Sequence, residues 1–113
     1  MKQNRGLAAL AALSGAFAVA AGAFATHGAS GREAEWLKTG AHYQLIHAVA
    51  ALTVLAMPRG RLAAMLFIGG GAVFAGTLYL MAFGAPHWLG AITPLGGSAL
   101  IIGWVALALG AVR

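Results

Sequence analysis

Residues 62–84, LAAMLFIGGGAVFAGTLYLMAFG, form an apolar stretch without a single charged side chain. A hydrocarbon core of about 30 Å is crossed by about 20 residues of α-helix, which rises about 1.5 Å per residue. This stretch is long enough to span a bilayer, and three other stretches are similarly apolar. The sequence therefore predicts four transmembrane helices, at about residues 6–27, 40–57, 62–84 and 93–112.

Charged residues lie only at the two ends of the chain and in the connections between these stretches. The chain has seven basic and two acidic side chains, 8% of its residues, whereas a soluble domain has about 25%. They are Lys2 and Arg5, then Arg32, Glu33, Glu35 and Lys38, then Arg59 and Arg61, and finally Arg113. The connections are too short to hold a water-soluble domain. Residues 1–113 are therefore expected to form a single all-α integral membrane domain, an up-down bundle of four transmembrane helices.

Composition also argues against several classes of function. The formal net charge is +5, but the basic residues are dispersed and are not interleaved with aromatic side chains, so we expect no nucleic-acid binding. Because the chain has no cysteine, disulfides, thiolate chemistry and cysteine metal sites are excluded. No catalytic or cofactor motif is present. The sequence therefore favours a protein that is not an enzyme and binds no cofactor.

The basic residues also predict the orientation of the helices. In a four-helix topology, one side of the membrane carries basic residues without an acidic one, namely Lys2, Arg5, Arg59, Arg61 and Arg113. The positive-inside rule places that side, and both termini, in the cytoplasm. Trp36 and Trp88 then lie at the outer interface, where indole rings concentrate. We expect a protein of the bacterial inner (plasma) membrane.

An alternative for the first apolar stretch is a cleaved secretory signal. Lys2 and Arg5 precede the stretch, and the triplet Ala-Phe-Ala at residues 23–25 resembles a cleavage site. The apolar run continues for about 20 residues, however, which is longer than the roughly 7–15 of a signal-peptide core. We therefore expect residues 6–27 to remain as a transmembrane helix.

Two segments carry signals for the start of a helix. Ser30 followed by Glu33 has the spacing of a capping box. A short interfacial helix is therefore expected to begin just after Ser30, between the first two transmembrane helices, and to turn into the membrane at Gly40. Before the last stretch, Thr93 followed by Pro94 predicts a helix start with Thr93 as the N-cap.

Glycines recur every seven residues in three of the four predicted helices. Such spacing puts them on one helix face, where the backbones of two helices can approach closely. Lipid supplies no hydrophobic drive between helices, so helix contacts depend on van der Waals packing over small residues. We predict that these glycines line contacts within the chain or between copies of it: Gly15, Gly22, Gly69, Gly76, Gly96, Gly103 and Gly110.

Polar side chains within the apolar stretches are concentrated toward the outer side of the predicted bundle. Because polar groups in hydrocarbon need hydrogen-bond partners, we expect them to face inward and to contact one another. The predicted buried polar cluster comprises His27, Tyr43, Gln44, His47, Thr77, Tyr79, Thr93 and Ser98. The inner half is mainly apolar, with Thr53 and Trp104 as the main exceptions.

One face of the second predicted helix holds Tyr43, Gln44 and His47, whereas His42 lies well off it. We interpret these side chains as forming hydrogen bonds that hold neighbouring helices together. The alternative is a haem or metal site with His27 and His47 as candidate ligands, since neutral imidazole is a common metal ligand. Zinc or haem needs ligands that converge, and no acidic residue lies within a predicted transmembrane helix to assist, so we predict no metal site.

Five short motifs occur in order along the chain and carry a family resemblance. They are GAFATH at residues 22–27, YQLIH at 43–47, FAGTLY at 74–79, TPLGG at 93–97 and GW at 103–104. They resemble the domain of unknown function 423 family, small four-helix bacterial inner-membrane proteins grouped with the eukaryotic transmembrane protein 256. The resemblance implies this architecture and a membrane location but no activity. His27 and His47 fall within the motifs, whereas His42 and His87 fall outside them.

Three classes of function remain. We favour a structural or accessory membrane protein, which acts in the lipid bilayer through helix packing with itself, as a homo-oligomer, or with another membrane protein. A small-molecule or proton transporter is the first alternative, motivated by His47 and Tyr79, but no Asp, Glu, Lys or Arg lies within an apolar stretch. A haem or metal site on the outer side of the bundle is the second alternative.

Overall fold

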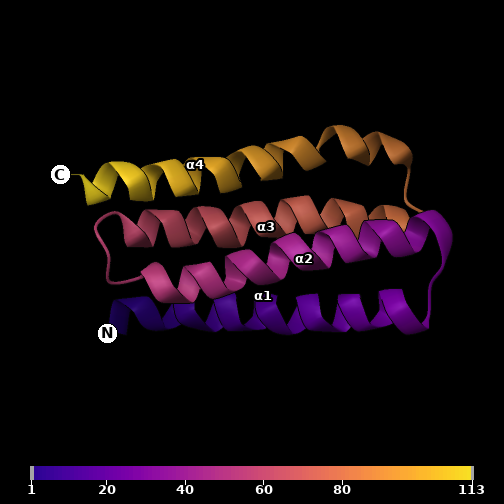
Figure 1. Ribbon diagram of the computed structural model, residues 1–113, viewed down its shortest axis with the longest axis horizontal. Coiled ribbons are helices and arrows are strands. Elements are labelled where there is room, and N and C mark those ends of the chain that lie inside the picture. Colours follow the sequence, from indigo (N-terminus) through magenta and orange to yellow (C-terminus); the bar gives the residue numbers. More distant parts are fainter. Residues whose placement is uncertain (1, 113) are drawn as a thin grey trace.

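The computed structural model describes residues 2–112 of the chain. It contains α1 (Lys2–His27), α2 (Gly31–Val54), α3 (Gly60–Ala82), the short 3-10 helix η1 (His87–Ala91) and α4 (Thr93–Ala111). Successive long helices run in opposite directions, so the start of α1 and the end of α4 lie at the same end of the molecule (Figure 1). The expected all-α fold of four long helices that run up and down is confirmed.

The four long helices lie side by side in chain order and do not close into a ring (Figure 1). α2 packs against α1 and α3, and α3 also packs against α4, whereas α1 contacts α3 only slightly. α1 and α4 are therefore the two edges of an open array. Leu13 of α1 and Ile101 of α4 are 67% and 65% exposed. Such apolar exposure suits helices that are surrounded by lipid.

Within residues 2–112, three segments are long and apolar enough to cross a membrane, namely Asn4–His27, Gly60–Ala82 and His87–Ala111. α2 differs from them because its first turns, GREAEWLK, carry charged side chains. Its apolar part, expected at residues 40–57, is the second half of a longer helix that ends at Val54.

The separate interfacial helix predicted before Gly40 is not present, because α2 is one continuous helix from Gly31 to Val54. Gly40 lies inside this helix and serves a packing role. A Cβ atom placed there would lie 2.7 Å from Cε1 of Tyr79, so a larger residue would displace that ring. Ser30 does occupy the N-cap position, with φ −149° and ψ 169°, but its side chain makes no capping hydrogen bond.

The start of α4 also differs from the prediction. Ile92 is the N-cap, whereas Thr93 is already helical and Pro94 lies in the first turn. The Thr93 hydroxyl does not cap the helix, because it is engaged with Thr77 of α3 and with the carbonyl of Leu89 in η1. A tertiary hydrogen bond has therefore replaced the local one that the sequence indicated.

Three glycines of α4 lie where that helix closely approaches neighbouring parts of the chain. A Cβ atom at Gly96 would overlap the backbone nitrogen of Phe74 and lie 2.7 Å from the carbonyl oxygen of Gly70. At Gly103 it would lie 2.6 Å from Cε1 of Phe67, which is 1% exposed. At Gly110 it would lie 2.6 Å from the carbonyl oxygen of Pro58. These three glycines let α4 approach α3 and the turn before it.

The other glycines predicted to line contacts divide into two groups. Cβ atoms at Gly15 and Gly22 would lie 3.7 Å and 3.6 Å from the side chains of Ala48 and Ala41, so these glycines face α2 at ordinary van der Waals distance. Cβ atoms at Gly69 and Gly76 would meet nothing within 4 Å. Those two α3 glycines therefore line no close contact within the described part of the chain.

We expect Gly96→Ala to be less stable than Gly69→Ala by about 1–3 kcal/mol, the usual cost of overpacking a filled contact. Both changes gain similar helix propensity, up to about 1 kcal/mol, so Gly69→Ala is the matched control. Reversible unfolding of the purified proteins in mixed detergent micelles would measure the difference. Equal stability of the two variants would contradict the close contact between α3 and α4.

Candidate functional site

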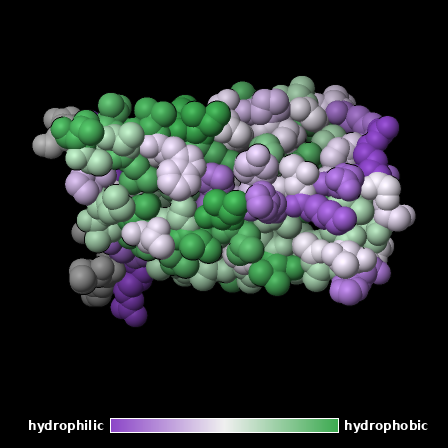
Figure 2. Space-filling model, viewed as in Figure 1, coloured by the Kyte–Doolittle hydropathy of each residue, from purple (hydrophilic) through white to green (hydrophobic). Residues whose placement is uncertain are grey.

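Polar residues are distributed unevenly over the molecule. Figure 2 shows hydrophobic residues over most of the half that contains the end of α4, apart from a hydrophilic patch where α1 begins. Hydrophilic residues become more frequent toward the other end, where α1 connects to α2. Among the described residues, five members of the predicted cluster are buried: Gln44, His47, Thr77, Tyr79 and Thr93.

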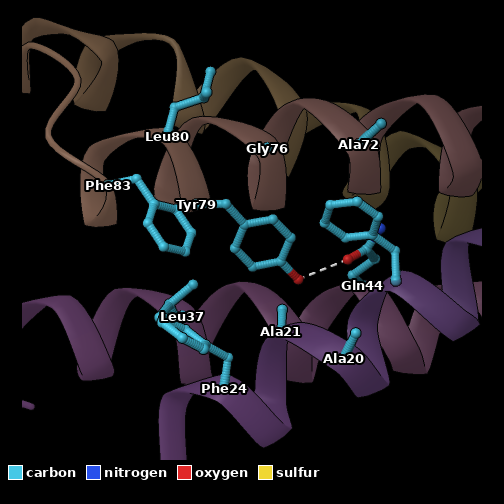
Figure 3. Close-up of a pocket in the computed structure, with 11 residues that line it drawn as sticks. Ala20, Ala21, Phe24, Leu37, Gln44, Ala72, Gly76, Tyr79, Leu80 and Phe83 are labelled. Carbon is cyan, nitrogen blue, oxygen red and sulfur yellow. Dashed lines mark hydrogen bonds between the residues drawn. The ribbon is translucent and has the colours of Figure 1, made fainter. Parts of the chain in front are cut away.

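The first polar contact joins α1, α2 and α3 through Gln44. The Tyr79 hydroxyl of α3 donates to Oε1 of Gln44 at 2.6 Å (Figure 3). On the other side, Nε2 of Gln44 donates to Oγ of Ser14 in α1 at 3.1 Å. Gln44 is 7% exposed, so these partners replace the water that it lacks. Ser14 was not predicted, and its only signal is that it is the one hydroxyl-bearing side chain in the middle of α1.

The second contact joins α2 and α4 through His47, which is 5% exposed. Its Nδ1 lies 2.6 Å from the carbonyl oxygen of Tyr43, and because a carbonyl only accepts, Nδ1 must donate. Nε1 of Trp104 lies 3.0 Å from Nε2 of His47, and because an indole N–H only donates, Nε2 must accept. The imidazole is therefore neutral in this arrangement, with both nitrogens engaged.

The third contact joins α3 and α4 through two threonines. Oγ1 of Thr77 lies 2.6 Å from Oγ1 of Thr93, and both residues are buried. Thr77 can also donate to the carbonyl oxygen of Val73, one turn earlier in its own helix, at 2.9 Å. Thr93 reaches the carbonyl oxygen of Leu89 at 3.3 Å. The polar residues thus form three separate contacts between helices and not one cluster.

Three of the predicted residues make none of these side-chain hydrogen bonds between helices. Tyr43 is 44% exposed and packs its ring against Phe74, with the ring centroids 5.0 Å apart. Ser98 is exposed and donates to the carbonyl oxygen of Pro94 in its own helix at 2.8 Å. His27 is exposed at the end of α1. Tyr43 still contributes its backbone carbonyl to the second contact.

The two candidate metal ligands lie far apart. His47 lies sixteen residues beyond Gly31, the start of α2, which is about 24 Å of helix rise, whereas His27 lies just before that start. Among the described residues, no group of three or more His, Cys, Asp or Glu side chains could hold a metal ion. A ligand role for His47 would also require the loss of a hydrogen bond at one of its nitrogens.

Two grooves flank the polar contacts. One has a volume of about 660 Å³ and lies between α1 and α3, with α2 beneath it; we call it the α1–α3 groove. It is lined by Phe17, Ala20, Ala21, Phe24, Leu37, Gln44, Ala72, Gly76, Tyr79, Leu80 and Phe83 (Figure 3). The other has a volume of about 600 Å³ and lies between α2 and α4, where Tyr43, His47 and Trp104 contribute to its wall. Neither groove was predicted from the sequence, since both depend on how the helices are arranged.

Comparison with known proteins identifies the family. Residues 21–97 match the family described as "Protein of unknown function (DUF423)". A UPF0382 membrane protein of Haemophilus influenzae is 42% identical, over 92% of this chain and 91% of that protein. The UPF0382 membrane protein YwdK of Bacillus subtilis is 36% identical, over 92% and 94%. The UPF0382 inner membrane protein YgdD of Escherichia coli K12 is 32% identical, over 97% and 92%.

No solved structure matches the chain. The family match extends from the second half of α1 to the first turns of α4, so it includes all three polar contacts except Ser14 and Trp104. The apolar helices described above agree with the membrane location that the names of the relatives state. The chain belongs to the DUF423 family of membrane proteins.

Proposed function

We propose that this chain is a structural or accessory membrane protein, which acts through contacts with itself or with another membrane protein. In this proposal its buried polar side chains hold the helices together and perform no chemistry. The observation that carries the proposal is the engagement of His47, whose two ring nitrogens are both occupied within the chain. The other buried polar side chains also have partners.

The apolar surface of the edge helices supports a role through contacts in the membrane. Large apolar side chains of α1 and α4 face outward, including Leu13, Val19, Ile101 and Val105, which are 50–67% exposed. Lipid can cover such a surface, but a second membrane helix can also pack on it by van der Waals contact. No charged residue lies on these outward faces between the two ends of the molecule.

We further propose that α2 is the fourth transmembrane helix and that both termini face the cytoplasm of a bacterial cell, as in an inner membrane protein. α2 packs against both α1 and α3, which are long and apolar enough to span. Arg5, Arg59 and Arg61 are exposed, and Nη1 of Arg61 donates to Oδ1 of Asn4 at 2.6 Å, so the starts of α1 and α3 meet at one end. Lys2 adds a basic residue to that end, although its side chain, like Arg113, lies outside the described residues. The positive-inside rule puts such an end in the cytoplasm.

A double-mutant cycle would test whether His47 and Trp104 act as structural partners. We expect His47→Phe and Trp104→Phe each to lower the free energy of unfolding, with a coupling of about 0.6–1.7 kcal/mol, the range measured for hydrogen bonds between membrane helices. His47→Gln should recover part of the loss, because a glutamine oxygen can still accept from the indole. Unfolding in mixed micelles would be measured for the wild type, the three single variants and the double variant His47→Phe/Trp104→Phe. Strictly additive single effects would contradict the contact.

The same variants separate a structural role from a site or a transporter. We expect the purified wild-type protein to contain no stoichiometric metal or haem, by absorption spectroscopy and metal analysis. We also expect liposomes that contain the protein to show no proton flux above that of empty liposomes. A stoichiometric metal or haem that disappears in both His47→Gln and His47→Phe would overturn the structural proposal, because an amide is a poor substitute for imidazole as a ligand. A flux that both variants abolish would favour the transporter.

Single cysteines introduced into this cysteine-free chain would test the orientation. Arg59→Cys, Glu35→Cys and His87→Cys all alter exposed positions. In intact bacterial cells, a membrane-impermeant maleimide should label positions 35 and 87 but not position 59, since only the end with unbalanced basic residues should be cytoplasmic. Permeabilised cells should be labelled at all three. Labelling of position 59 alone in intact cells would show the opposite orientation.

A further inference from the structure

The α1–α3 groove has dimensions that suit part of a membrane lipid. Its wall on the α3 side runs from Ala72 to Phe83, which lies just beyond the helix, and these twelve residues rise about 16 Å. One leaflet is about half of a hydrocarbon core of about 30 Å, so the wall has about the length of one leaflet. A volume of about 660 Å³ lies in the range of small-molecule sites. The groove therefore matches a lipid chain, which extends through one leaflet.

The chemistry of the lining indicates an uncharged, apolar occupant. No charged side chain lines the groove. Its two polar side chains, Gln44 and Tyr79, are hydrogen-bonded to one another at 2.6 Å (Figure 3). The remaining lining is aromatic, aliphatic or glycine, so a charged or strongly polar group placed there would lose its hydration without compensation. A hydrocarbon chain has no polar group that would lose its hydration there.

Two aromatic pairs limit the width of the groove. Phe17 of α1 stacks on Tyr79 of α3, with ring centroids 5.7 Å apart. Phe24 of α1 contacts Phe83, just beyond α3, with centroids 5.5 Å apart. These pairs connect the two walls. A helix with its side chains is about 10–12 Å in diameter, so it could enter the groove only if both pairs separated. A single hydrocarbon chain needs no such change.

Small residues keep the groove empty of the protein's own side chains. Gly76 lies in its α3 wall, and a Cβ atom there would meet nothing within 4 Å. Ala20 and Ala21 of α1 and Ala72 of α3 complete this small-residue part of the wall. A leucine at Gly76 would therefore extend into free space in the groove without overlapping a helix backbone.

We propose that the α1–α3 groove binds one acyl chain of a bilayer phospholipid, which stays with the protein as a resident ligand. The apolar lining, the length of one leaflet and the connected walls all favour this occupant over a second copy of the chain. The inference concerns a ligand of the folded protein, and it does not depend on the structural role proposed above.

Photo-crosslinking with a lipid probe tests this proposal. The full-length protein is reconstituted in vesicles of phosphatidylethanolamine and phosphatidylglycerol that contain a phosphatidylcholine with a diazirine midway along one acyl chain. Crosslinked peptides are then quantified by mass spectrometry. We expect the yield at Phe17 and Tyr79 in the groove to exceed severalfold the yield at Ile101 and Ile102, exposed residues of α4 that sample ordinary lipid.

Matched variants make the result specific to the groove. Gly76→Leu should reduce the yield at the groove to the level of the α4 face, whereas Gly69→Leu should leave it unchanged, because Gly69 has equal free space but lies outside the groove. Ala20→Leu fills the groove from the α1 wall and should repeat the loss even if Gly76→Leu fails to fold. Equal yields at the groove and at α4 in the wild type would overturn the proposal. So would a wild-type dimer that excludes the probe from the groove and dissociates in Gly76→Leu.

Discussion

The need to pair every polar group within the hydrocarbon region constrains this structure more than any other requirement. Lipid offers no hydrogen-bond partner, so an unpaired buried amide or imidazole would cost several kcal/mol. The chain meets this need with three hydrogen-bonded contacts, centred on Gln44, His47 and Thr77. Each contact joins different helices. Among the described residues, no buried side-chain nitrogen or oxygen atom is left without a partner.

These polar contacts and the small residues contribute to helix association in different ways. Glycines such as Gly96 and Gly103 let α3 and α4 approach until backbone and ring atoms touch, which gives van der Waals contact but little directional preference. The hydrogen bonds supply direction, because Trp104 reaches His47 only if α4 has the correct rotation about its axis. Packing thus sets how close the helices come, and the polar pairs set how they are turned.

Much of the fold could be predicted from hydropathy and charge, because the spacing of apolar runs is a property of the chain alone. The four helices and their alternating directions follow from that pattern, whereas the family follows from five short motifs. The features that were missed depend on neighbours in space. Gly40 was expected to mark the turn from an interfacial helix into the membrane. In the structure, the Tyr79 ring packs there against an unbroken α2. Thr93 looked like a helix cap, but Thr77 is its partner.

The sequence predicted which polar side chains would be buried but not which of them would form pairs. Gln44, His47, Thr77 and Thr93 were expected to be buried and are buried. One shared cluster was expected, however, because residue spacing gives depth in the membrane but not the rotation of one helix relative to the next. Ser14 and Trp104 were not included in the predicted cluster for the same reason, since each forms its hydrogen bond only when its helix lies beside its partner on α2.

The open order of the helices has a consequence for how the protein is made. α1 packs on α2, α2 on α3 and α3 on α4. Each long helix after α1 therefore packs against the long helix synthesised just before it. Contacts that are close in sequence form with little loss of chain entropy and need not await completion of the polypeptide. Each new helix could then dock as it leaves the ribosome and enters the bilayer. The hydrogen bond from Trp104 to His47, which spans 57 residues, would be the last to form and would lock the assembled array.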